Sequence, residues 1–153
     1  MKEPVGWAWR AFEELTPHQL YDVLALRQAV FIVEQRCVFP DADGRDDQAL
    51  HLLGTAADGK LLAYLRAFPP RPPHWPASIG RIVVHADVRG SGLGTAVVEE
   101  GLRMIAERYP GAAVRIAAQA AAEAFYARMG FVREGDPYDD EGILHIAMVR
   151  RGE

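Results

Sequence analysis

The hydrophobic and polar positions along the chain follow two alternating patterns. Short runs rich in branched and aromatic residues predict strands, and apolar residues spaced three or four apart predict amphipathic helices. We therefore expect strands over residues 7–12, 50–56, 60–68, 79–84, 113–118, 131–134 and 143–149, with helices from 17 to about 35, from 93 to 109 and from 120 to 129. This order, β-α-β-β-β-α-β-α-β-β, predicts a mixed α/β fold with helices packed on a central sheet.

Capping and turn residues set the boundaries of these elements. Thr16 can cap a helix whose first residue is Pro17, and Gln19 completes a capping box. The pair Asp58-Gly59 is a strong hairpin signal, and Gly130 suits the position just after a helix end. The stretches 69–76, rich in proline, and 136–142, rich in polar residues, are expected to be surface connections. No repeat or linker divides the chain, so residues 1–153 are expected to form a single domain.

Composition narrows the classes of function. Half of the residues are hydrophobic and 25% are charged, which is ordinary for a soluble globular protein. The net charge of −4 argues against a nucleic-acid-binding protein, which would usually be basic. No run resembles a membrane span or a signal peptide. Cys37 is the only cysteine, so no internal disulfide can form, and we expect a cytoplasmic protein without a membrane partner. A lone cysteine of this kind is more often a small buried hydrophobe than a nucleophile.

The aspartate-rich stretch 39–47 resembles the start of a calcium loop. The twelfth position of such a loop would be Leu52, whereas calcium requires a bidentate glutamate there. We therefore expect a solvated acidic loop and no metal site. Contact between these aspartates and a cationic substrate is the alternative.

The most specific signal lies between residues 82 and 95. A branched strand, Ile82-Val83-Val84, leads through a turn into Arg89-Gly90-Ser91-Gly92-Leu93-Gly94-Thr95, which opens a helix. Glycines allow a close approach of backbone to ligand, and amides at a helix N-terminus favour an anion. A P-loop is excluded because no lysine follows Gly94, and the dinucleotide fingerprint is excluded by its different glycine spacing.

The run from Arg89 to Gly94 meets the signature R/Q-x-x-G-x-G/A and resembles the GNAT superfamily of acyl-CoA-dependent N-acyltransferases. Residues 124–131 resemble the tyrosine-bearing helix of that family and the strand that follows it. The stretches 26–37, 118–120 and 140–148 resemble one branch, the ElaA-like acetyltransferases. The resemblance extends from about residue 20 to 150, apart from the proline-rich stretch. It implies a mostly antiparallel central sheet flanked by helices, with acyl-CoA in a cleft between two parallel central strands.

The resemblance also implies a reaction and a cofactor site. Acetyl-CoA would be the co-substrate, and a primary amine would attack it directly in a ternary complex. The backbone of Ile82, Val83 and Val84 would line the pantetheine arm, with the Val84 N–H polarising the thioester carbonyl. The pyrophosphate would be held by Gly90, Gly92 and Gly94 together with their neighbours Ser91, Leu93 and Thr95. Arg89 either adds charge to this site or is an exposed loop arginine.

The same resemblance makes Tyr126 the expected general acid. Its ordinary pKa near 10 keeps the hydroxyl protonated at neutral pH, as a proton donor requires. The alternative is a core tyrosine that packs beside Phe125 and Met129.

Three residues are candidates for the general base. Glu34 lies in an apolar run at a helix end, where burial could raise its pKa, or else it is a partly exposed carboxylate. His145 alternates with Leu144 and Ile146 on the last strand and therefore faces away from them, as a base, a substrate contact or a structural histidine. His51 is a weaker candidate, and His85 is expected to be a turn residue. A chain of water molecules could replace any single base.

The sequence fits more than one class of acceptor and more than one oligomeric state. A small-molecule amine and a peptide amine both fit the reaction, and a non-catalytic acyl-CoA sensor is the rival function. The presence of Tyr126 favours the enzyme. Trp7 and Trp9 on the first strand either contact a second copy in a homodimer or belong to the core.

Overall fold

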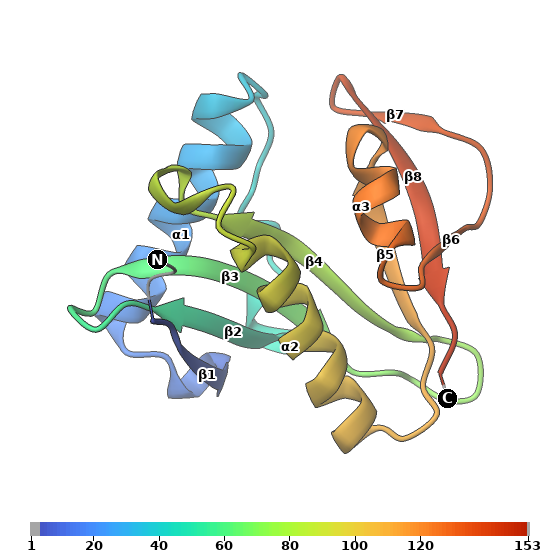
Figure 1. The fold of residues 1–153 in the computed structure, drawn as a ribbon, viewed down its shortest axis with the longest axis horizontal. Coiled ribbons are helices and arrows are strands. Elements are labelled where there is room, and N and C mark those ends of the chain that lie inside the picture. The colour runs from blue at the N-terminus through green and yellow to red at the C-terminus, as the bar shows by residue number, and fades with distance from the viewer. Residues whose placement is uncertain (1–3, 153) are drawn as a thin grey trace.

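A computed structural model describes residues 4–152 of the chain. Within these residues, eight strands form one sheet, and three α-helices pack on it (Figure 1). The strands are β1 (Gly6–Ala11), β2 (Leu50–Thr55), β3 (Leu61–Phe68), β4 (Ala77–Val84), β5 (Val114–Gln119), β6 (Val132–Arg133), β7 (Tyr138–Asp140) and β8 (Ile143–Arg150). The helices are α1 (Pro17–Gln28), which continues as a π-helical segment (Ala29–Glu34), α2 (Leu93–Arg108) and α3 (Glu123–Ala127).

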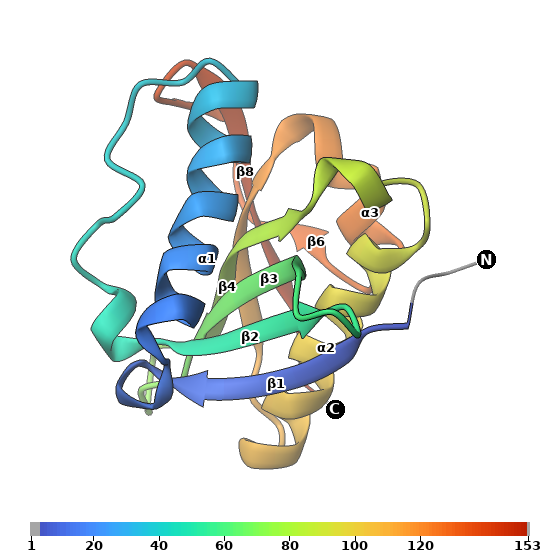
Figure 2. The same cartoon turned by 90° about the vertical axis from the view of Figure 1, so that its left-hand side faces the viewer.

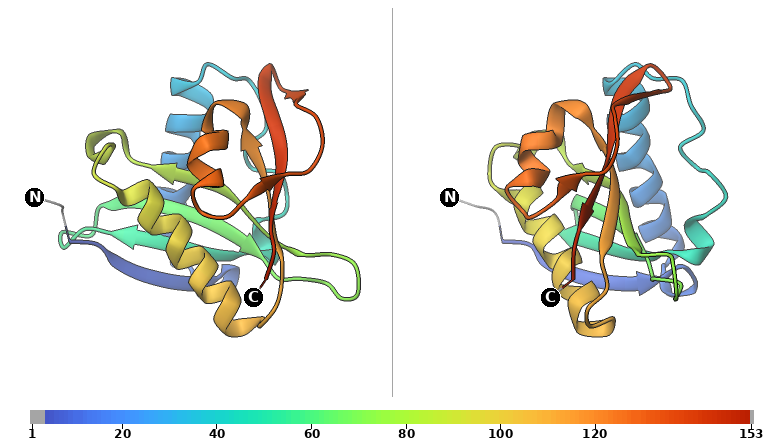
Figure 3. Two further views of the ribbon diagram at one scale, coloured as in Figure 1. Left: turned by 45° about the vertical axis from the view of Figure 1, so that its right-hand side comes forward. Right: turned by 90° about the vertical axis from the view of Figure 1, so that its right-hand side faces the viewer.

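The sheet lies between two helical layers. Helix α1 covers one face (Figure 2), whereas α2 and α3 cover the other (Figure 3). On the α1 face, Val23 and Leu26 pack against residues of β2, β3 and β4. The larger core lies on the α2 face, where Gly101 allows α2 to approach β3, because a Cβ at this position would lie 2.9 Å from a methyl group of Leu65. No helix in the described part of the chain is long and apolar enough to cross a bilayer.

The strand order is β1-β2-β3-β4-β5-β8-β6, with β7 also paired to β8. Only β4 and β5 run parallel, and their pairing is short: Ala77 lies opposite Val114, and Ser78 opposite Arg115. Beyond these residues the two strands diverge and leave a split in the sheet (Figure 1). The expected fold, a mostly antiparallel sheet with two parallel central strands, is confirmed.

Strand β4 contains a bulge beside this split. Tyr64 and Arg66 of β3 pair with Val83 and Gly80, so two residues of β4 lie opposite Leu65 alone. The first of the two, Arg81, has a φ of +50°, in the left-handed region that residues other than glycine seldom adopt. The bulge bends β4 just before the Ile82-Val83-Val84 run.

Several sequence-predicted boundaries are confirmed. The Thr16 hydroxyl accepts a hydrogen bond from the Gln19 N–H (3.1 Å), and the Gln19 side chain accepts one from the Thr16 N–H (3.0 Å). Gly59 has a φ of +90° in the turn between β2 and β3, and Gly130 has a φ of +94° after α3. Trp7 and Trp9 pack against the larger core, which supports the core alternative for these residues.

Three boundaries differ from the prediction. Residues 136–142 are not only a loop, because they contain β7, which forms a hairpin with β8. The two-residue turn, Glu141-Gly142, has positive φ at both positions, as in a type I′ turn, although Glu-Gly is not a typical signal for it. The helix expected over 120–129 is α-helical only over Glu123–Ala127, since Ala122 offers no side-chain cap. The strand expected over 131–134 is reduced to the two residues of β6.

Candidate active site

The split between β4 and β5 opens into a cavity of about 590 Å³. Its walls are the diverging halves of the two strands, residues 79–84 and 116–119. Side chains from both faces of the sheet reach it, because Phe31 and Glu34 come from the α1 side and Tyr126 comes from α3. The β7–β8 hairpin completes the lining. A cavity of this size is typical of sites for small molecules.

Tyr126 reaches the cavity from an apolar setting. Its ring lies 5.0 Å from that of Phe125 and packs edge-on against Phe131 at 5.9 Å, measured between ring centroids. Burial disfavours the charged phenolate and raises the pKa of Tyr126 to about 12. The hydroxyl is therefore protonated at neutral pH.

His145 lies on the opposite side of the cavity. Its Nδ1 is 2.8 Å from the carbonyl oxygen of Ile143, and because a carbonyl can only accept, Nδ1 carries the proton. In the neutral ring Nε2 is then free to accept a proton. Ile146 points into the core while His145 lines the cavity, so the predicted orientation is confirmed. Tyr138 stacks on the imidazole, with 6.0 Å between ring centroids.

Glu34 and Arg89 both line the cavity and form a bidentate ion pair. The two oxygens of Glu34 lie 2.6 and 2.8 Å from the guanidinium nitrogens of Arg89. The hydrogen bond from Arg89 lowers the pKa of Glu34, which is about half exposed. The raised pKa expected for a buried Glu34 is therefore wrong, and the alternative of a partly exposed carboxylate holds. Arg89 also contacts the carbonyl oxygen of Val84 (3.3 Å).

The glycine-rich loop lies at the N-terminus of α2. Gly90 and Gly92 have φ values of +79° and +87°, which an L-residue would adopt only with strain. Among the described residues no side chain caps α2, so its first amides have no partner within the helix and carry its positive dipole end. Ser91 donates a hydrogen bond to the carbonyl oxygen of Val88 (2.6 Å) and fixes the turn. The predicted anion-binding geometry is present beside the cavity, not within its lining.

The end of β4 turns one amide toward the split. The N–H of His85 donates to the carbonyl oxygen of Leu62 on β3 (2.7 Å). Consecutive amides of an extended strand point to opposite edges, so the N–H of Val84 points away from β3 and toward the cavity. His85 itself accepts a hydrogen bond from the Asp87 N–H (3.1 Å), which confirms its role as a turn residue.

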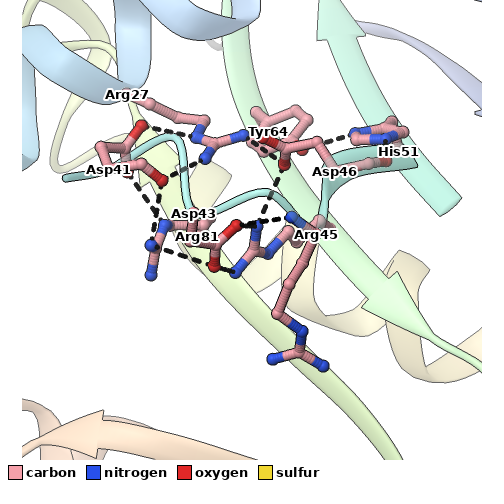
Figure 4. A network of polar contacts seen from close by, with 9 residues as sticks. Arg27, Asp41, Asp43, Arg45, Asp46, His51, Tyr64 and Arg81 are labelled. Carbon is pink, nitrogen blue, oxygen red and sulfur yellow. Dashed lines mark hydrogen bonds and ion pairs between the residues drawn. The ribbon is translucent and has the colours of Figure 1, made fainter. Parts of the chain in front are cut away.

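A network of charges, partly buried, joins several elements (Figure 4) and includes Arg81, which also lines the cavity. Its centre is Arg27 of α1, whose side chain is fully buried. Arg27 Nε lies 2.9 Å from Asp41 Oδ2, and its Nη1 lies 2.7 Å from Asp46 Oδ1. The solvated acidic loop expected over 39–47 is therefore wrong for Asp41, which is buried, and for Asp43 and Asp46, which neutralise arginines within the protein, whereas residues 42–45 and 47 are exposed.

Two further arginines extend this network to β3 and β4. Arg66 binds Asp43 (Nη2–Oδ2 2.5 Å) and Asp46 (Nη1–Oδ1 3.0 Å). Arg81, the bulge residue that lines the cavity, lies 2.9 Å from Asp41 (Nε–Oδ1), an ion pair in which neither atom makes a hydrogen bond within the described residues. The loop therefore connects α1 and β3 to the β4 bulge.

His51 belongs to this network and not to the cavity. Its Nε2 donates to the carbonyl oxygen of Asp46 (2.8 Å), which leaves Nδ1 to accept from the Tyr64 hydroxyl (2.6 Å). Burial lowers the pKa of His51 and raises that of Tyr64. His51 is therefore a structural histidine and not the general base.

The network predicts two stages of destabilisation by acid. The hydrogen bond from Arg66 lowers the pKa of Asp43, and for Asp46 the contacts with Arg27 and Arg66 outweigh the opposite effect of burial. For these aspartates, stability is present above an unfolded pKa of about 4 and is lost as the pH falls below it. For His51, stability is present above about pH 6.5 and is lost below it.

The urea midpoint of unfolding is therefore expected to fall between pH 7 and 5 and again below pH 4. In a His51→Gln variant the first decrease should be absent, whereas replacing the exposed His18 with Gln should preserve both. A wild-type midpoint that stays constant from pH 7 to 5 would contradict the assignment of a neutral, buried His51.

Residues 39–151 match the sequence profile of the acetyltransferase (GNAT) domain. The chain belongs to this family. It is 41% identical to the UPF0039 protein sll0451 of Synechocystis sp. over 147 residues, which are 96% of this chain and 96% of that protein. It is also 36% identical to the protein ElaA of Escherichia coli over 148 residues, 95% of this chain and 96% of that one.

Solved structures agree with this assignment. The crystal structure of an acyl-CoA N-acyltransferase from Pseudomonas aeruginosa matches with a TM-score of 0.90 at 37% identity, covering 96% of this chain and 99% of that one. The crystal structure of Escherichia coli ElaA matches with a TM-score of 0.89 at 35% identity, covering 96% of this chain and 99% of that one. The resemblance to ElaA-like GNAT acyltransferases is confirmed.

GNAT domains use acyl-CoA as their co-substrate, and the residues of this chain fit that molecule. The uncapped N-terminus of α2 suits the pyrophosphate, and the split leaves β4 backbone, including the Val84 amide, without a neighbouring strand. Among residues 4–152, no group of three or more His, Cys, Asp or Glu side chains is arranged to hold a metal ion.

The structure places most sequence-predicted site residues around one cavity. Tyr126, Glu34, His145, Arg89 and the run 82–84 all line it, while residues 90–95 lie beside it. Sequence reasoning missed Arg81, Gln35 and Gln119, which also line the cavity. The two glutamines lie within the stretches that resemble ElaA, which was the only signal for them.

Proposed function

We propose that this chain transfers the acetyl group of acetyl-CoA to a primary amine by direct attack in a ternary complex. The cavity at the β4–β5 split carries the proposal, because it gathers Tyr126, His145 and the Val84 amide beside an anion-binding loop. Membership of the GNAT family supports acyl transfer from acyl-CoA. Family membership does not specify the acyl group or the acceptor, so the acetyl group and the primary amine are our proposal.

Acetyl-CoA would supply an activated thioester. Its pyrophosphate would be held by the amides of residues 90–95, and its pantetheine arm by the backbone of Ile82, Val83 and Val84. The Val84 N–H would donate to the thioester oxygen as negative charge develops there. Arg89 is turned toward Glu34, so its contact with the phosphates requires a change of partner.

Proton transfer would be divided between two sides of the cavity. The attacking amine must be neutral, and His145 Nε2 is placed to accept its proton. Glu34 also lines the cavity, but a carboxylate with a lowered pKa is a weaker base. The geometry therefore supports His145 over Glu34. Tyr126 would protonate the departing thiolate.

Release of free thiol from acetyl-CoA in the presence of a panel of primary amines tests this proposal. We expect amine-dependent release with at least one amine and a matching acetylated product by mass spectrometry. Binding of CoA without turnover on any amine would instead support a non-catalytic acyl-CoA sensor, the rival function. Propionyl-CoA in a parallel assay tests the preference for the acetyl group.

The two candidate bases can be separated by the pH dependence of kcat/KM. We expect His145→Ala to lower kcat/KM by about 100-fold and to remove the acidic limb of the profile. Glu34→Gln should retain that limb, because the proposed base, His145, is unchanged in this variant. If only Glu34→Gln loses the acidic limb, Glu34 is the base and the preference for His145 is wrong.

A further inference from the structure

Glu34, Gln35 and Cys37 line the cavity after the helix on the α1 face of the sheet, and we name the four consecutive residues Glu34–Cys37 the clasp. Glu34 binds Arg89, which follows β4. Gln35 accepts a hydrogen bond from the side chain of Gln119 at the end of β5 (3.2 Å). The Cys37 thiol donates to the carbonyl oxygen of Glu141 in the β7–β8 turn (3.1 Å). The clasp therefore contacts both sides of the split sheet and the hairpin beyond it.

The backbone of the clasp is held in place by its own hydrogen bonds. The N–H of Gln35 donates to the carbonyl oxygen of Val30, and the N–H of Cys37 donates to that of Ile32, each at 3.1 Å. Arg36 adopts a φ of +53°, which turns the chain sharply between these two contacts. Cys37 is only 6% exposed, so the end of the clasp is packed against the protein. The hydrogen bonds and the burial of Cys37 hold the clasp in a defined conformation.

The clasp covers the side from which an acceptor would approach. Tyr126 and α2, with its anion-binding loop, lie on the α2 face, which leaves the α1 face for the amine. Phe31, Phe39 and His145 line the same cavity as the clasp. A backbone segment of a protein substrate would have to displace three polar contacts to bring an amine into this space, whereas a small molecule would not.

We infer that the acceptor is a small-molecule primary amine and not the amine of a protein or peptide. The inference rests on the proposed acyl transfer. A cavity of about 590 Å³ lies within the range that small ligands occupy, and here it must hold the reacting end of the thioester as well. The acceptor space beside the clasp suits a compact amine.

The test compares two panels of acceptors with acetyl-CoA at matched concentrations. One panel contains small alkyl and arylalkyl primary amines, and the other contains short peptides with a free lysine or a free N-terminal amine. Thiol release is measured and products are checked by mass spectrometry. We expect the best small amine to exceed every peptide in kcat/KM by about 100-fold or more.

Peptides that match or exceed the small amines would overturn the inference while leaving acyl transfer intact. Turnover on neither panel would overturn the proposed function and the inference with it. Variants Gln35→Ala and Gln119→Ala weaken the clasp, and we expect the ratio of peptide to small-amine kcat/KM to rise about tenfold in each. The exposed Gln28→Ala on α1 is the matched control, and its ratio should equal that of the wild type. An unchanged ratio in both clasp variants, with folding verified by thermal melting, would also overturn the inference.

Discussion

A Tyr126→Phe variant is expected to turn over at least about tenfold more slowly than the wild type, with CoA binding little changed. The substitution removes one hydroxyl and keeps the ring contacts with Phe125 and Phe131, so α3 should pack as before. Because burial raises the pKa of Tyr126 to about 12, the lost group is a protonated donor throughout the neutral range. The loss should therefore appear in kcat and should not depend on pH between 6 and 9.

The control for this variant is Tyr21→Phe, which removes a hydroxyl from an exposed position on α1. Its kcat should equal that of the wild type. CoA affinity measured by calorimetry separates the acid role from a binding role. If Tyr126→Phe retains the full kcat, Tyr126 is a core tyrosine, the alternative that its aromatic neighbours suggest.

An Arg27→Met variant is expected to lose about 3–5 kcal/mol of unfolding free energy. Arg27 is fully buried between Asp41 and Asp46, and removing it leaves three aspartates against the two remaining arginines, because Arg66 still contacts Asp43 and Asp46 and Arg81 still contacts Asp41. The loss arises chiefly from this uncompensated charge and not from the attraction that the pair had provided. Urea unfolding at pH 7 measures it.

The matched control is Arg103→Met, the same substitution at an exposed arginine that also binds two acidic residues, Glu100 and Glu107. Exposed ion pairs contribute little, so we expect a change of less than about 1 kcal/mol. Adding Asp41→Asn to Arg27→Met should cost less than the sum of the two single changes, because the second change removes a stranded charge. Equal losses for Arg27→Met and Arg103→Met would show that burial of the network is not what stabilises it.

The fold could be predicted from the sequence where local signals agree. The capping box at Thr16 and the Asp58-Gly59 turn fix their boundaries through contacts within a few residues, which a sequence displays directly. Strand β7 could not be found in this way. Its turn uses Glu141 at a positive φ, and its partner is the adjacent β8, so pairing and not composition makes it a strand.

The same difference between local and long-range signals decides which features of the site could be predicted. The glycine loop and Tyr126 were predictable because their spacing resembles a family. The environment of Glu34 was not, since its pKa depends on Arg89, 55 residues further along the chain. The buried role of the aspartate loop depends on Arg27, Arg66 and Arg81, which lie on three different elements. The only sequence signal for this role of the aspartates is Arg27, a charged residue at an apolar position of the helix expected from residue 17.

The π-helical segment before the clasp has a consequence for how related chains should be compared. A π-helical turn holds one residue more than an α-helical turn, because its hydrogen bonds join residues five apart and not four. A relative that is one residue shorter between Ala29 and Val33 can form an ordinary α-helical turn there and still bring the following four residues to the same place. A gap at that point would mark only a change of helix type. A gap within residues 34–37 would remove the contacts that span the cavity.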